Sequence, residues 1–322
     1  GIYQSKAVHL REIAMEIPGR AKTPSVVRRL QRFLNNAAIR VRKLYSPLAK
    51  RILQACSQHG QIRLIVDGTK VSFSHQLLMV GIGYRKRAIP LVWTWVRKKR
   101  GHSSAYKQLA LLAHVRALLP DNASVLLVGD SEFGSVDVLC QLDDWGWHYV
   151  LRQSSTHLID LTLHNHWQPF GDMASRGRSV WMERAHLTRK HVYPVNLLAH
   201  WEPGYKEPWL LATNLPNLTA TLRAYRRRMW IEEFFGDVKG HGFNLESTRL
   251  RHFLRLSRLT LAVCLLYVWL LFDGAQGIKN GKRHLVDRKD RRDLSLFQIG
   301  FGLIKRCLKN GLRLHIRLRP VF

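Results

Sequence analysis

The chain has 322 residues, of which 46% are hydrophobic, and carries a formal net charge of +30 at pH 7. The hydrophobic fraction is ordinary for a globular protein, and the length exceeds the roughly 150 residues of one typical domain, so two or three units with a sizeable core are expected. The four cysteines contain no Cys-x-x-Cys pair, which excludes a disulfide framework and a cysteine-based zinc site and fits a reducing cytoplasm.

The positive charge is concentrated at the two ends of the chain. Residues 1–58 contain 12 basic and 2 acidic residues, and residues 279–322 contain 13 basic and 3 acidic residues, which together make two thirds of the net charge. A polyanion is the natural partner, because neutralising phosphates releases condensed counterions. An anionic membrane or simple solubility could also explain a basic surface.

The amino-terminal part predicts basic helices. Residues 23–54 have the pattern of one or two amphipathic helices with Pro24 and Ser25 near the start. The basic residues singled out along them are Arg28, Arg29, Arg32, Arg40, Arg42 and Lys43. We interpret this stretch as a region that binds the polyanion. The alternative is a solvated basic helix that packs on the core.

Alternating strand and helix patterns follow. Strands are predicted at 62–67, 76–84, 88–96, 125–130 and 148–153, and helices at 103–119 and 135–145. Asp67 and Asp130 each end a strand-like run and are expected to enter a turn, a position where α/β proteins collect functional groups. Either aspartate alone could be a turn former or a helix N-cap.

Two further features lie downstream. Residues 180–187, 192–201 and 208–216 resemble strands separated by turn residues. Residues 225–239 then predict one helix on which Tyr225, Arg228, Glu232 and Lys239 fall within roughly 60° of one another beside an apolar face. The alternative is an ordinary amphipathic helix with a weak Arg228–Glu232 pair.

Three acids from two strands and a helix suggest metal chemistry. If Asp67, Asp130 and Glu232 converge, they form an all-oxygen pocket, which suits Mg²⁺ or Mn²⁺ rather than zinc. Two such ions can hold the attacking and leaving oxygens of an in-line phosphoryl displacement.

These residues carry a resemblance to a known family. Asp67 in IVDGTK, Asp130 in LLVGDSEFGS, and the Tyr225, Arg228, Glu232, Lys239 series resemble the DDE transposases of bacterial insertion sequences, specifically the insertion sequence 4 family. The family signature is Tyr, two residues, Arg, three residues, Glu, six residues, Lys, and every gap fits. The resemblance covers residues 60–250 well.

The resemblance implies an α/β fold with an RNase H-like mixed-sheet catalytic core, a β-strand insertion before the catalytic glutamate, and helical basic regions at both ends. The implied units are a helical DNA-binding region at 1–58, a core in two parts at 59–152 and 217–275, the insertion at 153–216, and a basic carboxy-terminal region at 276–322. The expected activity is metal-dependent cleavage at transposon ends followed by strand transfer.

Roles for single residues follow from the same resemblance. Asp67, Asp130 and Glu232 are the implied ligands of two Mg²⁺ or Mn²⁺ ions, and Arg228 and Lys239 the implied phosphate contacts. Tyr225, Trp209 and Arg152 are further implied DNA contacts, of which Trp209 would hold a base flipped out at a hairpin on the transposon end. Packing is an alternative role for Trp209, and a structural role for Arg152.

The implied partners are double-stranded DNA at terminal inverted repeats and target DNA, bound by a homodimer that forms on DNA. We expect a bacterial cytoplasmic, nucleoid-associated protein, because no signal-peptide pattern occurs at the start. The longest apolar run, Leu259 to Phe272, predicts a buried helix rather than a membrane span. Two alternatives remain: another RNase H-like nuclease, and a truncated or domesticated DNA-binding remnant, which the absence of an initial methionine keeps open.

Overall fold

A single mixed sheet runs through most of the molecule. The computed structural model describes residues 1–71, 75–97, 103–162 and 164–322. Across these described residues the sheet has ten strands in the order β3-β2-β1-β4-β5-β10-β9-β8-β6-β7. The strands are β1 (Ile62–Val71), β2 (His75–Tyr84), β3 (Arg87–Arg97), β4 (Val125–Gly129), β5 (His148–Arg152), β6 (Leu158–Asp160), β7 (Gln168–Pro169), β8 (Ser179–Leu187), β9 (Tyr193–His200) and β10 (Trp209–Thr213).

The first five strands form the half of the sheet that carries the fold class. Strands β1, β2 and β3 pair antiparallel, whereas β1, β4 and β5 pair parallel. The strand order 3-2-1-4-5 with this mixture of directions is the arrangement of an RNase H-like core. The predicted α/β fold class is therefore confirmed, and each strand and helix predicted between residues 62 and 153 is present.

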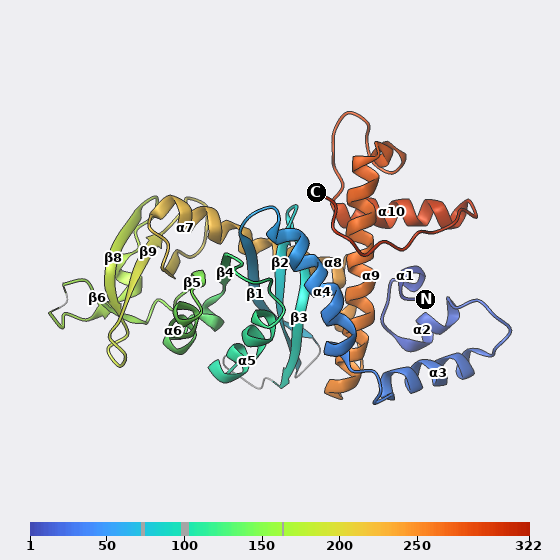
Figure 1. Ribbon diagram of the computed structural model, residues 1–322, viewed down its shortest axis with the longest axis horizontal. Helices are drawn as coiled ribbons and strands as arrows, with labels where there is room; N and C mark the ends of the chain where they lie inside the picture. The colour runs from blue at the N-terminus through green and yellow to red at the C-terminus, as the bar shows by residue number, and fades with distance from the viewer. Residues whose placement is uncertain (72–74, 98–102, 163) are drawn as a thin grey trace.

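Helices cover both faces of this half of the sheet. Consecutive residues of a strand point to opposite faces, so the almost unbroken burial of β2 and β4 requires cover on each side. The helices α4 (Val41–Ser57), α5 (Ala105–Arg116), α8 (Met229–Val238) and α9 (Phe253–Lys279) contact its strands, and α6 (Val136–Asp144) packs on β5. Figure 1 shows α4 and α5 around the central strands and α9 beside β3.

The remaining strands lengthen the same sheet. Strand β10 returns antiparallel to β5, with Leu211 opposite Arg152 and Thr213 opposite Val150, and β9, β8, β6 and β7 follow outward. Two short 3₁₀ turns, η1 (Ser131–Phe133) and η2 (Phe170–Met173), occur before and within this part. The predicted β-strand insertion before Glu232 is confirmed, and backbone hydrogen bonds join it to the core sheet.

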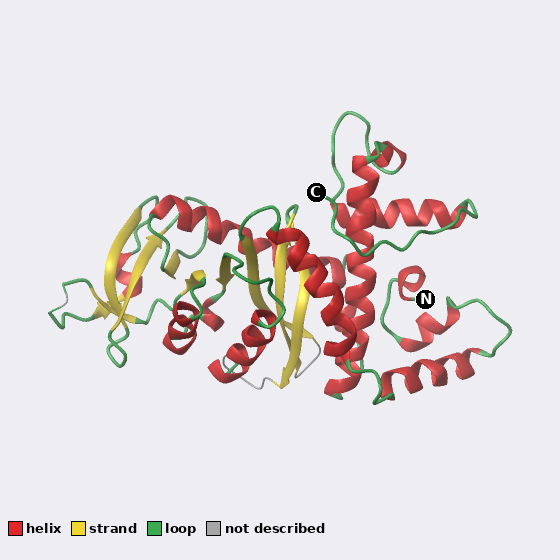
Figure 2. Ribbon diagram, in the orientation of Figure 1, coloured by secondary structure: helices red, strands yellow, loops and turns green. Residues whose placement is uncertain are grey.

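The other end of the molecule is helical, as Figure 2 shows on the right. The amino-terminal helices are α1 (Ile2–Ser5), α2 (Leu10–Met15) and α3 (Thr23–Asn35). Arg258 of α9 fixes this region, because its guanidinium donates to the carbonyl oxygens of Leu34 at 2.7 Å and Ile39 at 3.2 Å. In α3 only Val26 and Leu34 are buried, so its basic side chains face solvent.

Helix α9 is longer than the predicted apolar run. Of the described helices, it alone is long and apolar enough to cross a membrane by length and composition, but 61% of its most apolar window is buried inside the protein. It packs against β3, α3, α4 and α10 (Leu296–Lys309). Gly274 and Gly300 allow the close approach of α10, since a Cβ atom on Gly300 would lie 1.9 Å from the Leu270 carbonyl oxygen.

Candidate active site

Two neighbouring parallel strands deliver the two aspartates. The last paired residues of β1 and β4 are Val66 and Gly129, and Asp67 and Asp130 come directly after them. Asp130 leaves β4 and precedes η1 without a side-chain capping hydrogen bond. The expectation that Asp67 enters a turn is wrong, because β1 stays hydrogen-bonded to β2 on its other side as far as Val71. Asp67 therefore lies at the point where the sheet opens between β1 and β4.

The predicted signature helix is divided into several segments. Tyr225 ends α7 (Leu218–Tyr225), Arg228 ends the 3₁₀ turn η3 (Arg226–Arg228), and Glu232 lies in the first turn of α8. Lys239 has left the helix, with φ −94° and ψ −122°, since Gly240 follows it and the chain turns back onto the Lys239 carbonyl oxygen. A single helix from Tyr225 to Lys239 is thus wrong, although its helical spacing holds from Arg228 to Glu232.

Arg228 lies between two of the predicted acids. Its guanidinium donates through Nη1 to Asp67 Oδ2 at 3.0 Å and through Nη2 to Glu232 Oε1 at 2.5 Å. The Arg228 and Asp67 side chains are each 12% exposed, whereas that of Glu232 is 44% exposed. Burial alone would lower the pKa of Arg228, but the facing Tyr225, Asp67 and Glu232 groups raise it overall. The cation is held firmly in its charged form.

The pKa of Asp67 shows that the three acids share one electrostatic environment. Burial raises it to about 7, while the Arg228 guanidinium and the Gly68 N–H group, which donates at 2.7 Å, act in the opposite direction. The charges of Asp130 and Glu232 raise it further. Removing water from a carboxylate outweighs one ion pair at this position.

The two aspartates fit a hard divalent cation. Asp130 Oδ1 is buried and has no hydrogen-bond partner among the described residues, and the neighbouring donor groups are carboxylate oxygens, the ligands that Mg²⁺ and Mn²⁺ prefer. Within the described part of the chain, however, no three His, Cys, Asp or Glu side chains are gathered as a ready ligand group. Arg228 Nη2 contacts Oε1 of Glu232, so this oxygen is turned to the guanidinium and not to the aspartates.

Tyr225 connects the acids to the insertion. Its side chain is 2% exposed, its hydroxyl group has no partner in the described structure, and burial raises its pKa to about 12. The ring lies 5.9 Å from the Arg228 guanidinium and meets the Trp209 ring edge-on at 5.1 Å. Trp209, at the start of β10, is therefore brought next to the signature residues by the sheet.

The other two predicted residues contact protein groups. Arg152 Nη2 donates to Glu207 Oε2 at 2.9 Å and to the Pro208 carbonyl oxygen at 3.1 Å. Lys239 Nζ donates to the Lys70 carbonyl oxygen at 2.9 Å and lies 3.8 Å from Glu246. Lys239 thus ties the end of α8 to the end of β1, on the side where Asp67 lies.

Glu132 is a neighbouring acid that the sequence patterns did not single out. It accepts hydrogen bonds from the Ser103 backbone at 2.9 Å and from Gln76 Nε2 at 2.8 Å. A Cβ atom on Gly68 would lie 2.3 Å from Gln76 Nε2 and 3.2 Å from Glu132 Oε2, which explains the glycine after Asp67. The only sequence signal for Glu132 is its place two residues after Asp130.

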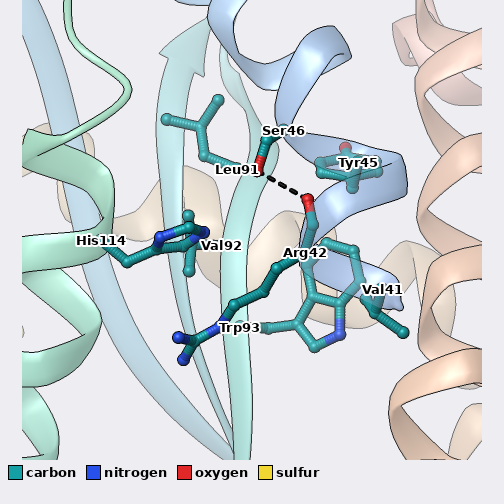
Figure 3. Close-up of a pocket in the computed structure, with 8 residues that line it drawn as sticks. All are labelled: Val41, Arg42, Tyr45, Ser46, Leu91, Val92, Trp93 and His114. Atoms are coloured by element: carbon teal, nitrogen blue, oxygen red, sulfur yellow. Dashed lines mark hydrogen bonds between the residues drawn. The ribbon is translucent and has the colours of Figure 1, made fainter.

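A separate pocket, drawn in Figure 3, lies between α4, β3 and α5. Arg42 and Ser46 come from α4, Trp93 from β3 and His114 from α5. Burial and then Arg42 lower the pKa of His114. No carboxylate lines this pocket, so it does not share the chemistry of the acid site.

The strand order defines a protein with an RNase H-like core, in which one acid lies on β1, one follows β4 and one lies in α8. The family model of the transposase DDE domain matches residues 58–269, and the chain belongs to this family. Among solved structures, it is similar to a piggyBac transposase in a cryo-EM synaptic complex with hairpin DNA, with 11% identity and a TM-score of 0.36. That match covers 80% of this chain and 57% of the piggyBac chain. No curated protein shows significant sequence similarity.

Proposed function

We propose that this chain is a DNA transposase of the insertion sequence 4 type, which cleaves DNA at transposon ends and transfers the freed strand. The observation that carries the proposal is the bridge from Arg228 to Asp67 and Glu232 in the core of a transposase DDE domain, with the charge of Asp130 acting on Asp67. The Tyr-Arg-Glu-Lys spacing supports the narrower family.

Asp67 and Asp130, joined by Glu232, would hold two Mg²⁺ or Mn²⁺ ions. When bound, such ions supply Lewis-acid activation of the attacking and leaving oxygens of a phosphodiester. The protein groups then position the DNA. The unpartnered Oδ1 of Asp130 supports this role, because a buried carboxylate oxygen without a donor is costly unless a cation is bound.

Arg228 and Lys239 would contact phosphates near the bond that is cleaved. A guanidinium can bind a phosphate through two hydrogen bonds, and lysine acts as a point charge. When a phosphate draws Arg228 away from Glu232, the glutamate becomes free to join the aspartates. Tyr225 would contact a terminal phosphate beside Arg228.

A hairpin on the transposon end is the proposed intermediate, with Trp209 as the aromatic surface for a flipped base. An aromatic stack returns roughly 1 to 3 kcal/mol against the few kcal/mol that base extrusion costs. Arg152 would contact DNA close to Trp209. The edge-on contact of the Trp209 ring with Tyr225, and the charge of Arg152 that acts on Tyr225, support these two roles.

The proposed partners are terminal inverted repeats and target DNA, bound by a homodimer in the bacterial cytoplasm at the nucleoid. The units proposed are a DNA-binding region at 1–58, a core at 59–152 and 217–275, an insertion at 153–216 and a basic region at 276–322. The exposed basic face of α3 supports DNA binding by the first unit.

A DNA cleavage assay tests the proposal. Its substrate is a labelled duplex that carries the terminal inverted repeat of the transposable element that flanks the gene. With Mg²⁺ or Mn²⁺, we expect a nick at the repeat boundary that Glu232→Gln abolishes while DNA affinity is nearly unchanged. Glu233→Gln is the matched control, since Glu233 is the adjacent residue of α8 and pairs with Arg87 at 3.0 Å instead. Equal cleavage by both variants would remove Glu232 from the site, and salt-sensitive binding without any nick would favour a DNA-binding remnant.

A further inference from the structure

Basic side chains gather near the amino end of β1, on the same face of the sheet as Asp67. Side chains alternate along a strand, so Arg63 and Asp67, four residues apart, point to one face. At roughly 3.3 Å per residue, their Cα atoms are about 13 Å apart. The 3₁₀ turn η3, whose Arg228 reaches Asp67, packs against β1 and α7.

Three arginines from three elements form this group, which we call the arginine cluster: Arg63 of β1, Arg223 of α7 and Arg227 of η3. Arg63 and Arg223 are exposed, and Arg227 is half-buried. Burial lowers the pKa of Arg227, and the charges of Arg63 and Arg223 lower it further. The groups that act on Arg227 are therefore other cations.

The neighbouring arginines of η3 are neutralised, whereas the cluster is not. Arg228 pairs with Asp67 and Glu232, and Arg226 lies 3.6 Å from Glu202. In the described part of the chain, Asp and Glu form no ion pair with any member of the arginine cluster. Like charges held together without a counterion destabilise the folded chain, so their convergence points to an anion supplied from outside.

The indole of Trp230 borders the cluster. It packs over Gly83 of β2, where a Cβ atom would lie 3.1 Å from the Trp230 ring and 3.7 Å from the Arg63 carbonyl oxygen. Gly83 therefore permits α8 to lie close to the sheet beside Arg63. The cluster rests on packed elements rather than on a free loop.

We propose that the arginine cluster binds a DNA backbone phosphate and so holds the strand at a fixed distance from the bond that is cleaved. The cluster lies about 13 Å along β1 from Asp67, so a DNA strand that contacts both places is held at two points. Guanidinium groups bind phosphate bidentately, which gives position as well as affinity. This positioning rests on the proposed function, because the distance is measured from the acid site.

The test compares wild type with Arg63→Ala and Arg223→Ala in the full chain. Each variant should lower the slope of log affinity against log salt for a labelled duplex by about one. Phosphate-ethylation interference at a backbone phosphate away from the cut should disappear in each variant. Arg226→Ala is the matched control, since Arg226 already has Glu202 as a counterion, and its slope should stay that of wild type. Arg63→Lys should keep the slope.

Slopes and interference patterns equal to wild type in both cluster variants would overturn the proposal. A calorimetric titration with inorganic phosphate separates the sources of the anion: heat that Arg63→Ala abolishes, with an unchanged DNA slope, would assign the cluster to free phosphate and overturn DNA binding. Lowered slopes in a protein that cannot nick DNA would sink the transposase proposal but keep the cluster. DNA nicking by the wild type, with salt slopes unchanged in both cluster variants, would support the transposase proposal and overturn the role of the cluster.

Discussion

The two ends of one face of β1 differ in whether their charged side chains have an ion-pair partner within the protein. At Asp67 the acids are neutralised by Arg228, whose two amino groups contact Asp67 and Glu232. At the other end, Arg223 and Arg227 lie near Arg63 and add to its positive charge. Burial and the charges of Arg63 and Arg223 lower the pKa of Arg227, so its charged form is disfavoured. Among the described residues, the chain supplies an internal counterion at the first end and none at the second.

This difference has consequences for what each end can bind. A cation reaches the carboxylates only by competing with Arg228, so binding there is coupled to movement of that side chain. A phosphate approaching the arginine cluster meets no internal counterion and loses only water and salt. The same substitution, arginine to alanine, should therefore change stability in opposite directions at the two ends.

The largest effect is expected at the neutralised end. Arg228→Ala should lower the free energy of unfolding by about 3 kcal/mol, because it leaves Asp67 buried without its cation. Added Mn²⁺ should raise the melting temperature more in this variant than in wild type, since the ion then replaces the missing guanidinium. Thermal and urea unfolding, with and without Mn²⁺, measure both quantities.

Arg226→Ala is the control for that experiment, because its contact with Glu202 lies on the surface and should contribute less than about 1 kcal/mol. An equal loss of stability in both variants would show that the charge of η3, rather than the bridge to Asp67, matters.

A third ionic group on α8 separates the effect of burial from that of charge matching. Asp237 accepts a hydrogen bond from Arg87 Nε at 2.9 Å, yet burial raises its pKa to about 6. The folded chain then binds more protons than the unfolded chain between about pH 4 and 6, so stability falls as pH rises through that window and is level above it. The total change from this group should be roughly 2 to 3 kcal/mol.

Urea unfolding of wild type and Asp237→Asn across this pH range isolates the contribution, because other acids act on both proteins alike. The difference between the two free energies of unfolding should change by roughly 2 to 3 kcal/mol between about pH 4 and 6 and stay constant on either side of that window. A difference that does not vary with pH would mean that Arg87 fully compensates the burial of Asp237.

The smallest effect is expected at the unmatched end. Arg63→Ala removes a like charge and an exposed side chain, so the free energy of unfolding should rise or stay within about 0.5 kcal/mol of wild type. Differential scanning calorimetry should be done at low salt, because dissolved ions screen the repulsion between the arginines. The sign of the stability change is then clearest. A fall of about 1 kcal/mol in the free energy of unfolding would mean that Arg63 has a stabilising partner within the protein. Arg63 and Arg228 would then not differ in this respect.

Local residue patterns in the sequence predicted most of the strands and helices of the fold. Runs such as those before Asp67 and Asp130 predict buried strands because apolar side chains on both faces require cover on both faces. The path of β1 beyond Asp67 was not predictable, because Gly68 and Thr69 have turn composition and only pairing with β2 keeps them extended. Similarly, residue spacing suggested a helix through Lys239, whereas packing and Gly240 end it one residue earlier.

The sequence by itself determined the chemistry: three carboxylates at strand and helix positions, the Tyr-Arg-Glu-Lys spacing, and a large excess of positive charge. These features depend only on residue type and on spacing along the chain, and both can be read directly from the sequence. Only the tertiary structure decided that Arg228 bridges Asp67 and Glu232, and that Trp209 meets Tyr225. It also decided that three arginines converge with no acidic ion-pair partner among the described residues. Such pairings join residues far apart along the chain, and their energies depend on burial and distance, which a linear pattern does not contain.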